Sequence, residues 1–175
     1  MRILLQSILL VGLMGCNSHC EEPKPLDPID QLPPITQTGE NTFGCLVNGE
    51  AYVVTNTNNH FALHQAPQQI QFGGGYIGTG QISFILNDTN LISEGIYKLD
   101  TLSSDKQGRG SYIIGFETTP CIFETKFPIS GEVEIDHIDR LKFIVSGTFN
   151  YDAVSVDCQD TVHITDGRFD MQYTP

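Results

Sequence analysis

FGCLVNGEAYVV, residues 43–54, predicts a β-hairpin and sets the fold class of the chain. Two runs of β-forming residues, 43–47 and 50–54, flank Asn48-Gly49. Asn and Gly tolerate the positive φ angles that a type I′ turn requires at both central positions, and this turn joins adjacent antiparallel strands. We therefore expect two paired strands here.

Short stretches in which apolar and polar residues alternate follow the hairpin. We expect strands at residues 69–72, 81–86, 95–99, 111–117, 121–127, 131–135 and 141–152. The polar residues 55–69 predict a loop, with a short helical turn at 61–63. Helical periodicity is absent over any dozen residues. The sequence therefore predicts an all-β domain, preferably a single antiparallel β-sandwich, with a β-barrel as the alternative.

The last strand contains a conflict in its alternation. Val162 and Ile164 occupy even positions, whereas the apolar residues from Phe169 onward occupy odd positions. A regular strand cannot bury both sets, because successive side chains point to opposite faces. We predict a β-bulge at Asp166-Gly167, with Gly167 in the left-handed conformation.

The first residues form an export signal. An apolar run at residues 3–13 ends in Leu13-Met14-Gly15-Cys16, and it is shorter than the roughly 20 residues of a membrane-spanning helix. We interpret residues 1–15 as a lipoprotein signal peptide. The Cys16 thiol is acylated first, and cleavage then makes Cys16 the first residue of the mature chain; an ordinary signal peptide is the alternative.

Residues 16–42 contain five of the nine prolines. Proline fixes φ and removes a backbone donor, so we expect an extended tether that resists packing. The β domain then covers residues 43–175. The formal charge is −12, which disfavours nucleic acid and anionic bilayer surfaces as partners. Membrane attachment must therefore come from the lipid on Cys16.

Four further cysteines follow Cys16. Cys20, Cys45, Cys121 and Cys158 allow three complete pairings, and thiols outside the cytosol tend to oxidise. We favour a Cys121–Cys158 disulfide, with Cys45 as a buried thiol and Cys20 free or weakly paired in the tether.

Two motifs suggest ligands but lack the necessary context. Residues 73–78 match Gly-x-Gly-x-x-Gly, yet a strand rather than a helix follows, so we expect a turn or strand bend instead of a nucleotide site. His60 and His64 have the spacing of zinc ligands on a helix, but their flanks predict a loop, so we interpret them as surface histidines. We assign no metal and no cofactor.

Carboxylates provide the remaining candidates for chemistry. Glu132 and Glu134 project from one face of a strand, as paired glycosidase carboxylates can, but an outward-facing charged strand face is the ordinary explanation. The C-terminal part is acidic, without the spacing of a dedicated calcium loop; its carboxylates are Asp157, Asp160, Asp166 and Asp170. We assign no catalytic residue.

The stretch LPPITQTGENTFGCLVNG, residues 32–49, and ITDGRFD, residues 164–170, carry a family resemblance. Together with the Leu-x-Gly-Cys motif, they resemble small outer-membrane lipoproteins of Bacteroidota whose function is uncharacterised. The resemblance implies a lipid-anchored protein of the outer membrane, on its periplasmic or cell-surface face. It implies no catalytic residues.

These observations predict a lipid-anchored, non-enzymatic binding or accessory module, with an envelope protein or a glycan as partner. An envelope hydrolase acting on glycans, using Glu132, Glu134 or the C-terminal aspartates, is one alternative. A purely structural envelope protein is the other. A pocket with converging carboxylates would favour the hydrolase.

Overall fold

The computed structural model describes residues 26–76, 78–99, 105–115, 119–126 and 131–175. The signal peptide, the lipidation candidate Cys16 and Cys20 lie outside the described residues. The described part contains two short 3₁₀ helices and eleven strands, and their bounds are η1 Pro28–Gln31, β1 Thr42–Val47, β2 Glu50–Val53, η2 Thr57–Asn59, β3 His60–Ala66, β4 Gln69–Tyr76, β5 Gly80–Asp88, β6 Gly95–Lys98, β7 Lys106–Ile114, β8 Cys121–Glu124, β9 Gly131–Asp139, β10 Ile144–Ser155 and β11 Asp160–Gln172.

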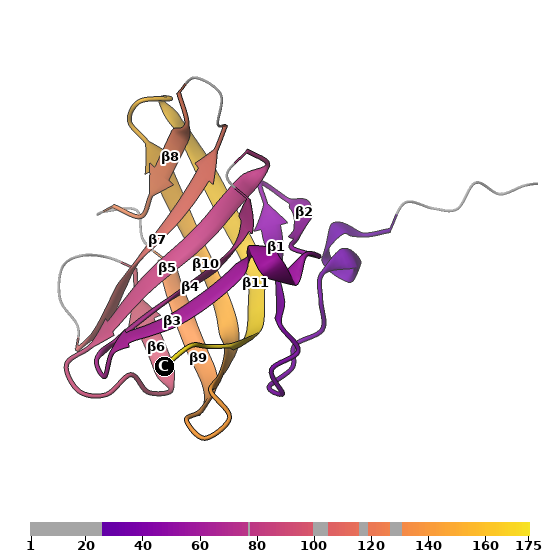
Figure 1. Cartoon of the computed structure of the whole chain (residues 1–175). Helices are drawn as coiled ribbons and strands as arrows, with labels where there is room; N and C mark the ends of the chain where they lie inside the picture. Colours follow the sequence, from indigo (N-terminus) through magenta and orange to yellow (C-terminus); the bar gives the residue numbers. More distant parts are fainter. Residues whose placement is uncertain (1–25, 77, 100–104, 116–118, 127–130) are drawn as a thin grey trace, which may run out of the picture.

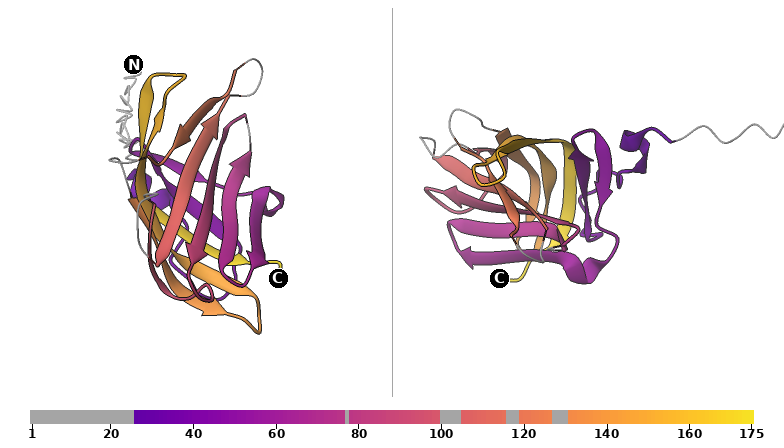
Figure 2. Two further views of the ribbon diagram at one scale, coloured as in Figure 1. Left: turned by 90° about the vertical axis from the view of Figure 1, so that its left-hand side faces the viewer. Right: turned by 90° about the horizontal axis from the view of Figure 1, so that it is seen from above.

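The strands form one sheet that closes on itself. Its order is β2-β1-β11-β10-β9-β6-β7-β5-β4-β3, and β8 connects β7 to β10. At the other side, Thr174 bridges to Leu63 of β3 directly after β11 ends. Viewed from above, β3–β5 lie opposite β9–β11, with the core between them (Figure 2). The all-β prediction is confirmed, and the strands form a small β-barrel core with outer strands, the architecture considered as the alternative to a sandwich.

The barrel interior is filled by aromatic side chains from several strands. The rings of Phe84 and Phe149 lie 4.8 Å apart between centroids, and those of Phe72 and Phe169 lie 4.5 Å apart. Phe43 stacks on Phe149 at 5.3 Å. Ring pairs at such distances add to the stabilisation from area burial. All five rings are at most 2 % exposed, so the interior is a packed core.

Most strands lie where alternation placed them. The β1–β2 turn has positive φ at Asn48 (51°) and Gly49 (85°), as a type I′ turn requires. Alternate residues of β5 are buried, as predicted. β7 begins at Lys106 rather than at residue 111, and β9 continues to Asp139 instead of ending at residue 135.

The loop predicted at residues 55–69 is wrong over its second half. Residues 60–66 form β3, and the one helical turn lies earlier, at η2. The turn or bend predicted at residues 73–78 is wrong for the first glycines, which continue β4 with Gly73 and Gly74 opposite β3; a turn is found only at residues 78–79. A Cβ on Gly74 would lie 2.9 Å from the Phe43 ring. Glycine at this position therefore makes room for a core ring.

The predicted bulge in β11 is present, but its left-handed residue is not the predicted one. The β10–β11 register shifts between Phe149 and Tyr151, opposite Gly167 and Ile164. Asp166 has a φ of 54°, whereas Gly167 lies outside the left-handed region. A Cβ on Gly167 would lie 2.3 Å from the Phe149 ring, so glycine is needed there for space.

The expectation that the whole tether resists packing is wrong for residues 32–41, which we call the strap. Leu32 is buried, and the Arg168 guanidinium donates to the Pro33 carbonyl at 3.2 Å. The side chain of Asp170 in β11 binds four groups of the strap. Figure 1 shows this part of the chain beside β1 and β2. The folded unit therefore begins before residue 43.

Candidate functional site

A pocket of about 410 Å³ lies where β3 meets the end of β11. The pairing of β1 with β11 ends at Thr42, which lies opposite Asp170. On the other side of the pocket, β3 pairs with the chain that follows β11 only at Thr174. The resulting gap in the barrel wall is what we call the seam pocket. It is lined by Asn41, Thr57, His60, Phe61, Ala62, Met171, Gln172, Tyr173 and Thr174.

Backbone bonds fix the closed end of the gap. The Thr174 N–H donates to the Ala62 carbonyl, and the His64 N–H donates to the Thr174 carbonyl, both at 2.8 Å. Beside them, the Gln172 N–H donates to Oδ1 of Asn41 at 3.0 Å. These bonds hold the two walls at a fixed separation.

Asn41 is positioned by the strap. Its φ is 54°, a conformation that Asn adopts more readily than most residues. The preceding residues are held by Asp170, whose carboxylate accepts from Thr36 Oγ1 (2.7 Å) and from the N–H groups of Thr38 (3.0 Å), Gly39 (2.8 Å) and Glu40 (3.1 Å). Burial alone would raise the pKa of Asp170, but these donors hold that pKa below its ordinary value.

His60 lies in the wall of the seam pocket. Its Nε2 lies 3.1 Å from the Val54 carbonyl oxygen, which can only accept, so Nε2 carries the hydrogen. Burial lowers the pKa of His60, and the hydrogen bond to the Val54 carbonyl offsets only part of this effect. The neutral ring therefore leaves Nδ1 as an acceptor, and this buried atom has no hydrogen-bond partner within the described residues. Such unsatisfied buried atoms are uncommon in folded proteins.

The lining carries no formal charge. It combines the amides of Asn41 and Gln172 and the hydroxyls of Thr57 and Thr174 with apolar surface. The chain as a whole has a formal charge of −12. The seam pocket is thus a recess with a neutral and largely polar lining in an acidic protein.

The structure does not bring the candidate carboxylates together in a pocket. Glu132 and Glu134 project from β9, where Oε2 of Glu132 lies 2.5 Å from Nζ of Lys98. Neither residue lines the seam pocket or the second pocket, which lies over the β11 bulge. The geometry therefore gives no support to a pair of glycosidase carboxylates.

The C-terminal aspartates have separate environments. Asp157, Asp160 and Asp166 are exposed, whereas Asp170 is buried beneath the strap. Within the described residues no three His, Cys, Asp or Glu side chains form a group that could hold a metal ion. His60 and His64 both lie on β3, a strand rather than the predicted loop, and the ring of His64 contacts Tyr173 with centroids 5.7 Å apart.

A second polar cluster was not anticipated from the sequence. Lys106 Nζ lies 2.7 Å from Ser93 Oγ and 3.7 Å from Asp88 Oδ2, and it sits 5.0 Å from the centroid of the Tyr97 ring. The Ser93 hydroxyl donates to Asp88 at 3.1 Å. The cluster secures the connection between β5 and β6, because Lys106 also donates to the carbonyls of Ser93 and Glu94. No described pocket opens onto it.

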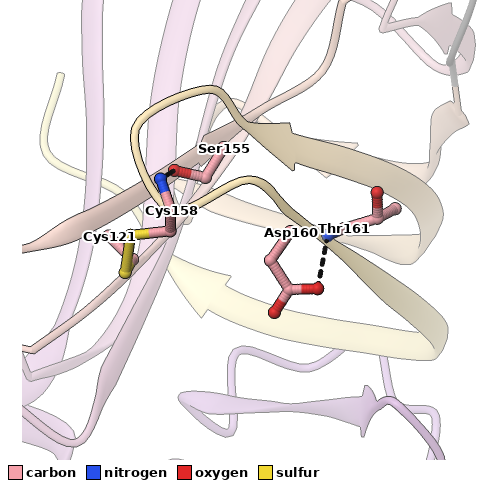
Figure 3. The surroundings of a disulfide bond; sticks show 5 residues. All are labelled: Cys121, Ser155, Cys158, Asp160 and Thr161. Atoms are coloured by element: carbon pink, nitrogen blue, oxygen red, sulfur yellow. Dashed lines mark hydrogen bonds between the residues drawn. A yellow bond between two sulfur atoms is a disulfide. The ribbon is translucent and has the colours of Figure 1, made fainter.

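The cysteine pair favoured from the sequence is joined in the structure. Cys121 at the start of β8 and Cys158 in the β10–β11 turn form a disulfide across 37 residues (Figure 3). The Cys158 N–H donates to Ser155 Oγ at 3.3 Å. Cys45 is free and buried in the core, as expected. Burial raises the pKa of its thiol, so Cys45 stays protonated and unreactive.

A second pocket, of about 420 Å³, lies on the barrel over the β11 bulge. Its lining includes Asn150, Asp166, Arg168 and, from the strap, Ile35. The guanidinium of Arg168 is already bonded to Pro33. This pocket therefore offers an internal comparison for the seam pocket, with a similar volume and a charged lining.

Among the described residues, no helix has the length and apolar character needed to cross a bilayer. Comparison with curated proteins and with solved structures finds no significant match. A family model, described as a domain of unknown function (DUF6252), matches residues 74–171. The matched span runs from the end of β4 through most of β11 and includes the disulfide, the bulge and Asp170. Because it covers more than half of the chain, this protein belongs to the DUF6252 family.

Proposed function

We propose that this protein is a lipid-anchored binding module of the bacterial outer membrane. Acyl chains on Cys16 hold it at the membrane, and the barrel binds its ligand in the seam pocket. The Leu-x-Gly-Cys motif at residues 13–16 and the resemblance to Bacteroidota outer-membrane lipoproteins support the anchor. The acidic charge of the chain supports it too, because the polypeptide itself has little attraction for an anionic bilayer.

The observation that carries the binding role is the seam pocket. Its walls are fixed by backbone bonds at Ala62 and His64 and by the side chain of Asn41. Ligand sites are commonly preformed recesses with a few positioned polar groups. An enzymatic role lacks comparable support, since Glu132 is paired with Lys98 and the C-terminal aspartates are dispersed.

The anchor is tested by replacing single cysteines in the full-length chain. The Cys16→Ser variant should not incorporate an alkyne-labelled fatty acid and should retain its signal peptide. It should therefore be absent from the lipidated proteins of the membrane fraction. Cys20→Ser is the matched control and should behave as wild type. Fatty-acid labelling and membrane retention that persist in Cys16→Ser would refute the anchor.

The binding role is tested on the mature chain carrying Cys16→Ser, labelled with ¹⁵N. We would titrate it separately with neutral oligosaccharides, anionic oligosaccharides and short peptides, and record amide chemical shifts. Binding in the proposed site should shift residues 57–62 and 171–174 and leave residues 165–168 of the second pocket unchanged. Shifts that are absent with all three classes, or confined to the second pocket, would refute the proposal.

A further inference from the structure

We infer that the ligand of the seam pocket is a neutral carbohydrate of one or two sugar units. This inference rests on the binding function proposed above and adds the chemical class of the ligand. Its basis is the set of polar groups that the pocket presents, together with the absence of charge among them.

Four side-chain groups at the pocket are available for hydrogen bonding. Nδ2 of Asn41, the amide of Gln172 and the hydroxyls of Thr57 and Thr174 make no hydrogen bond to other described residues. Amides and hydroxyls both donate and accept hydrogen bonds. The hydroxyl groups of a sugar do the same, so the two sets are complementary.

Charge limits the ligand further. Among the described residues, no Lys or Arg lines the pocket to bind a phosphate or carboxylate, and no Asp or Glu lines it to bind a cation. His60 does not change this, because its lowered pKa keeps the ring neutral near pH 7. The net charge of −12 also repels anions from the whole molecule. A neutral ligand satisfies all three conditions.

Size and apolar surface are consistent with a small sugar. The volume of about 410 Å³ falls at the small end of ligand sites, which span roughly 300–1,000 Å³. Among the apolar lining residues, Phe61 is half-buried and can meet the C–H face of a sugar ring, whereas Ala62 and Met171 are buried behind the pocket wall.

A peptide strand is the competing occupant, and the backbone argues against it. Adding a strand requires a continuous free edge. The β3 edge is already used at Ala62 and His64, where Thr174 bonds to both residues. The N–H of His60 is likewise bonded, to the Thr57 carbonyl of η2. Too little of the edge remains for a strand to pair along it.

The test is a glycan array followed by calorimetric titration of the mature Cys16→Ser chain. We expect binding to neutral mono- or disaccharide units and none to uronic-acid or phosphorylated glycans. In that background, Gln172→Ala and Thr57→Ala should each weaken binding roughly fivefold, the effect of one lost hydrogen bond to a neutral group. Asn150→Ala removes an exposed amide from the second pocket and should leave affinity unchanged.

Thermal unfolding of each variant separates loss of contacts from loss of fold. Binding restricted to anionic glycans, an absence of glycan binding, or equal effects of Asn150→Ala and Gln172→Ala would overturn the carbohydrate assignment. If peptides shift the seam residues while sugars do not, the binding function stands and the carbohydrate inference falls. If neither class shifts them, both fail.

Discussion

Replacing Asp170 should release the strap from the barrel. Asp170 is 1 % exposed. Its Oδ2 accepts from Thr36 Oγ1 and from the N–H groups of Thr38 and Glu40, and its Oδ1 accepts from the Gly39 N–H. In Asp170→Asn the amide oxygen can still accept from up to three of these donors, but the NH₂ group faces the remaining donor. The substitution also removes the negative charge that strengthens all four hydrogen bonds.

The cost follows from these bonds. In Asp170→Asn three hydrogen bonds lose their charge assistance, and at the fourth position an NH₂ group faces an N–H donor. A buried unsatisfied group alone costs about 1–3 kcal/mol, so the free energy of unfolding should fall by about 3 kcal/mol. Urea titration followed by tyrosine fluorescence measures this difference, since the chain has no Trp. Hydrogen exchange should show faster exchange at the amides of Thr38, Gly39 and Glu40.

Asp166→Asn is the matched control. Asp166 lies on the same strand, is exposed, and has a φ of 54° that Asn tolerates. Its replacement should change the free energy of unfolding by less than about 0.5 kcal/mol. If Asp170→Asn and Asp166→Asn have the same stability and the same strap exchange rates, the anchoring argument is refuted.

The effect of Asp170 also depends on pH. Its folded-state pKa lies below the ordinary value, so the ionised carboxylate contributes its full stability above the unfolded Asp pKa of about 3.9. That contribution is lost as the pH falls through the folded-state pKa. The stability difference between wild type and Asp170→Asn should therefore be constant near neutrality and shrink below about pH 4. A difference that grows on acidification would contradict this sign.

Three further predictions concern the core and the disulfide. Reduction of Cys121–Cys158, which closes a span of 37 residues, should lower the free energy of unfolding by about 4 kcal/mol on the chain-entropy model; a chain with both cysteines changed to Ser should not respond to reductant in urea titrations. Gly167→Ala places a Cβ 2.3 Å from an aromatic ring and should cost about 3 kcal/mol. Gly49→Ala, with open space around it and a φ of 85°, should cost about 1 kcal/mol; equal costs in thermal unfolding would contradict the steric argument. The Cys45 thiol should react with Ellman's reagent only at the rate of unfolding, because it is buried and its pKa is raised.

Local pattern was sufficient for the regular strands. Alternation identified β5, β9 and β10 because each has one face in the core, and that face needs apolar side chains at every second residue. The change in alternation along β11 predicted the bulge for the same reason. The left-handed residue was misassigned because Gly167 is explained by the nearby Phe149 ring, which only tertiary structure reveals.

Contacts between distant residues could not be read from local pattern. The prolines of the strap suggest an extended tether, whereas its partner Asp170 lies 130 or more residues away in the sequence. The sequence does not indicate β3, because its only fully buried residue, Ala62, lies among the polar residues His60, His64 and Gln65. The seam pocket depends on both of these elements. Its site residues were therefore not identified from the sequence, apart from His60, which was considered for a different role.

The family match covers residues that stabilise the barrel, but it omits almost all residues of the proposed binding site. Residues 74–171 include the disulfide, the bulge and Asp170, which together stabilise the barrel and anchor the strap. Apart from Met171, every residue that lines the seam pocket lies outside the matched span. The family match therefore covers residues that stabilise the barrel but carries no information on the ligand. Since Asn41 is held by a strap that Asp170 secures, the matched barrel positions a pocket whose chemistry is supplied by the flanking segments.

It follows that Asp170→Asn should weaken sugar binding as well as stability, although Asp170 itself lies outside the pocket lining. Retention of full affinity in this variant under conditions where the strap amides exchange freely would show that the strap does not position Asn41 for binding.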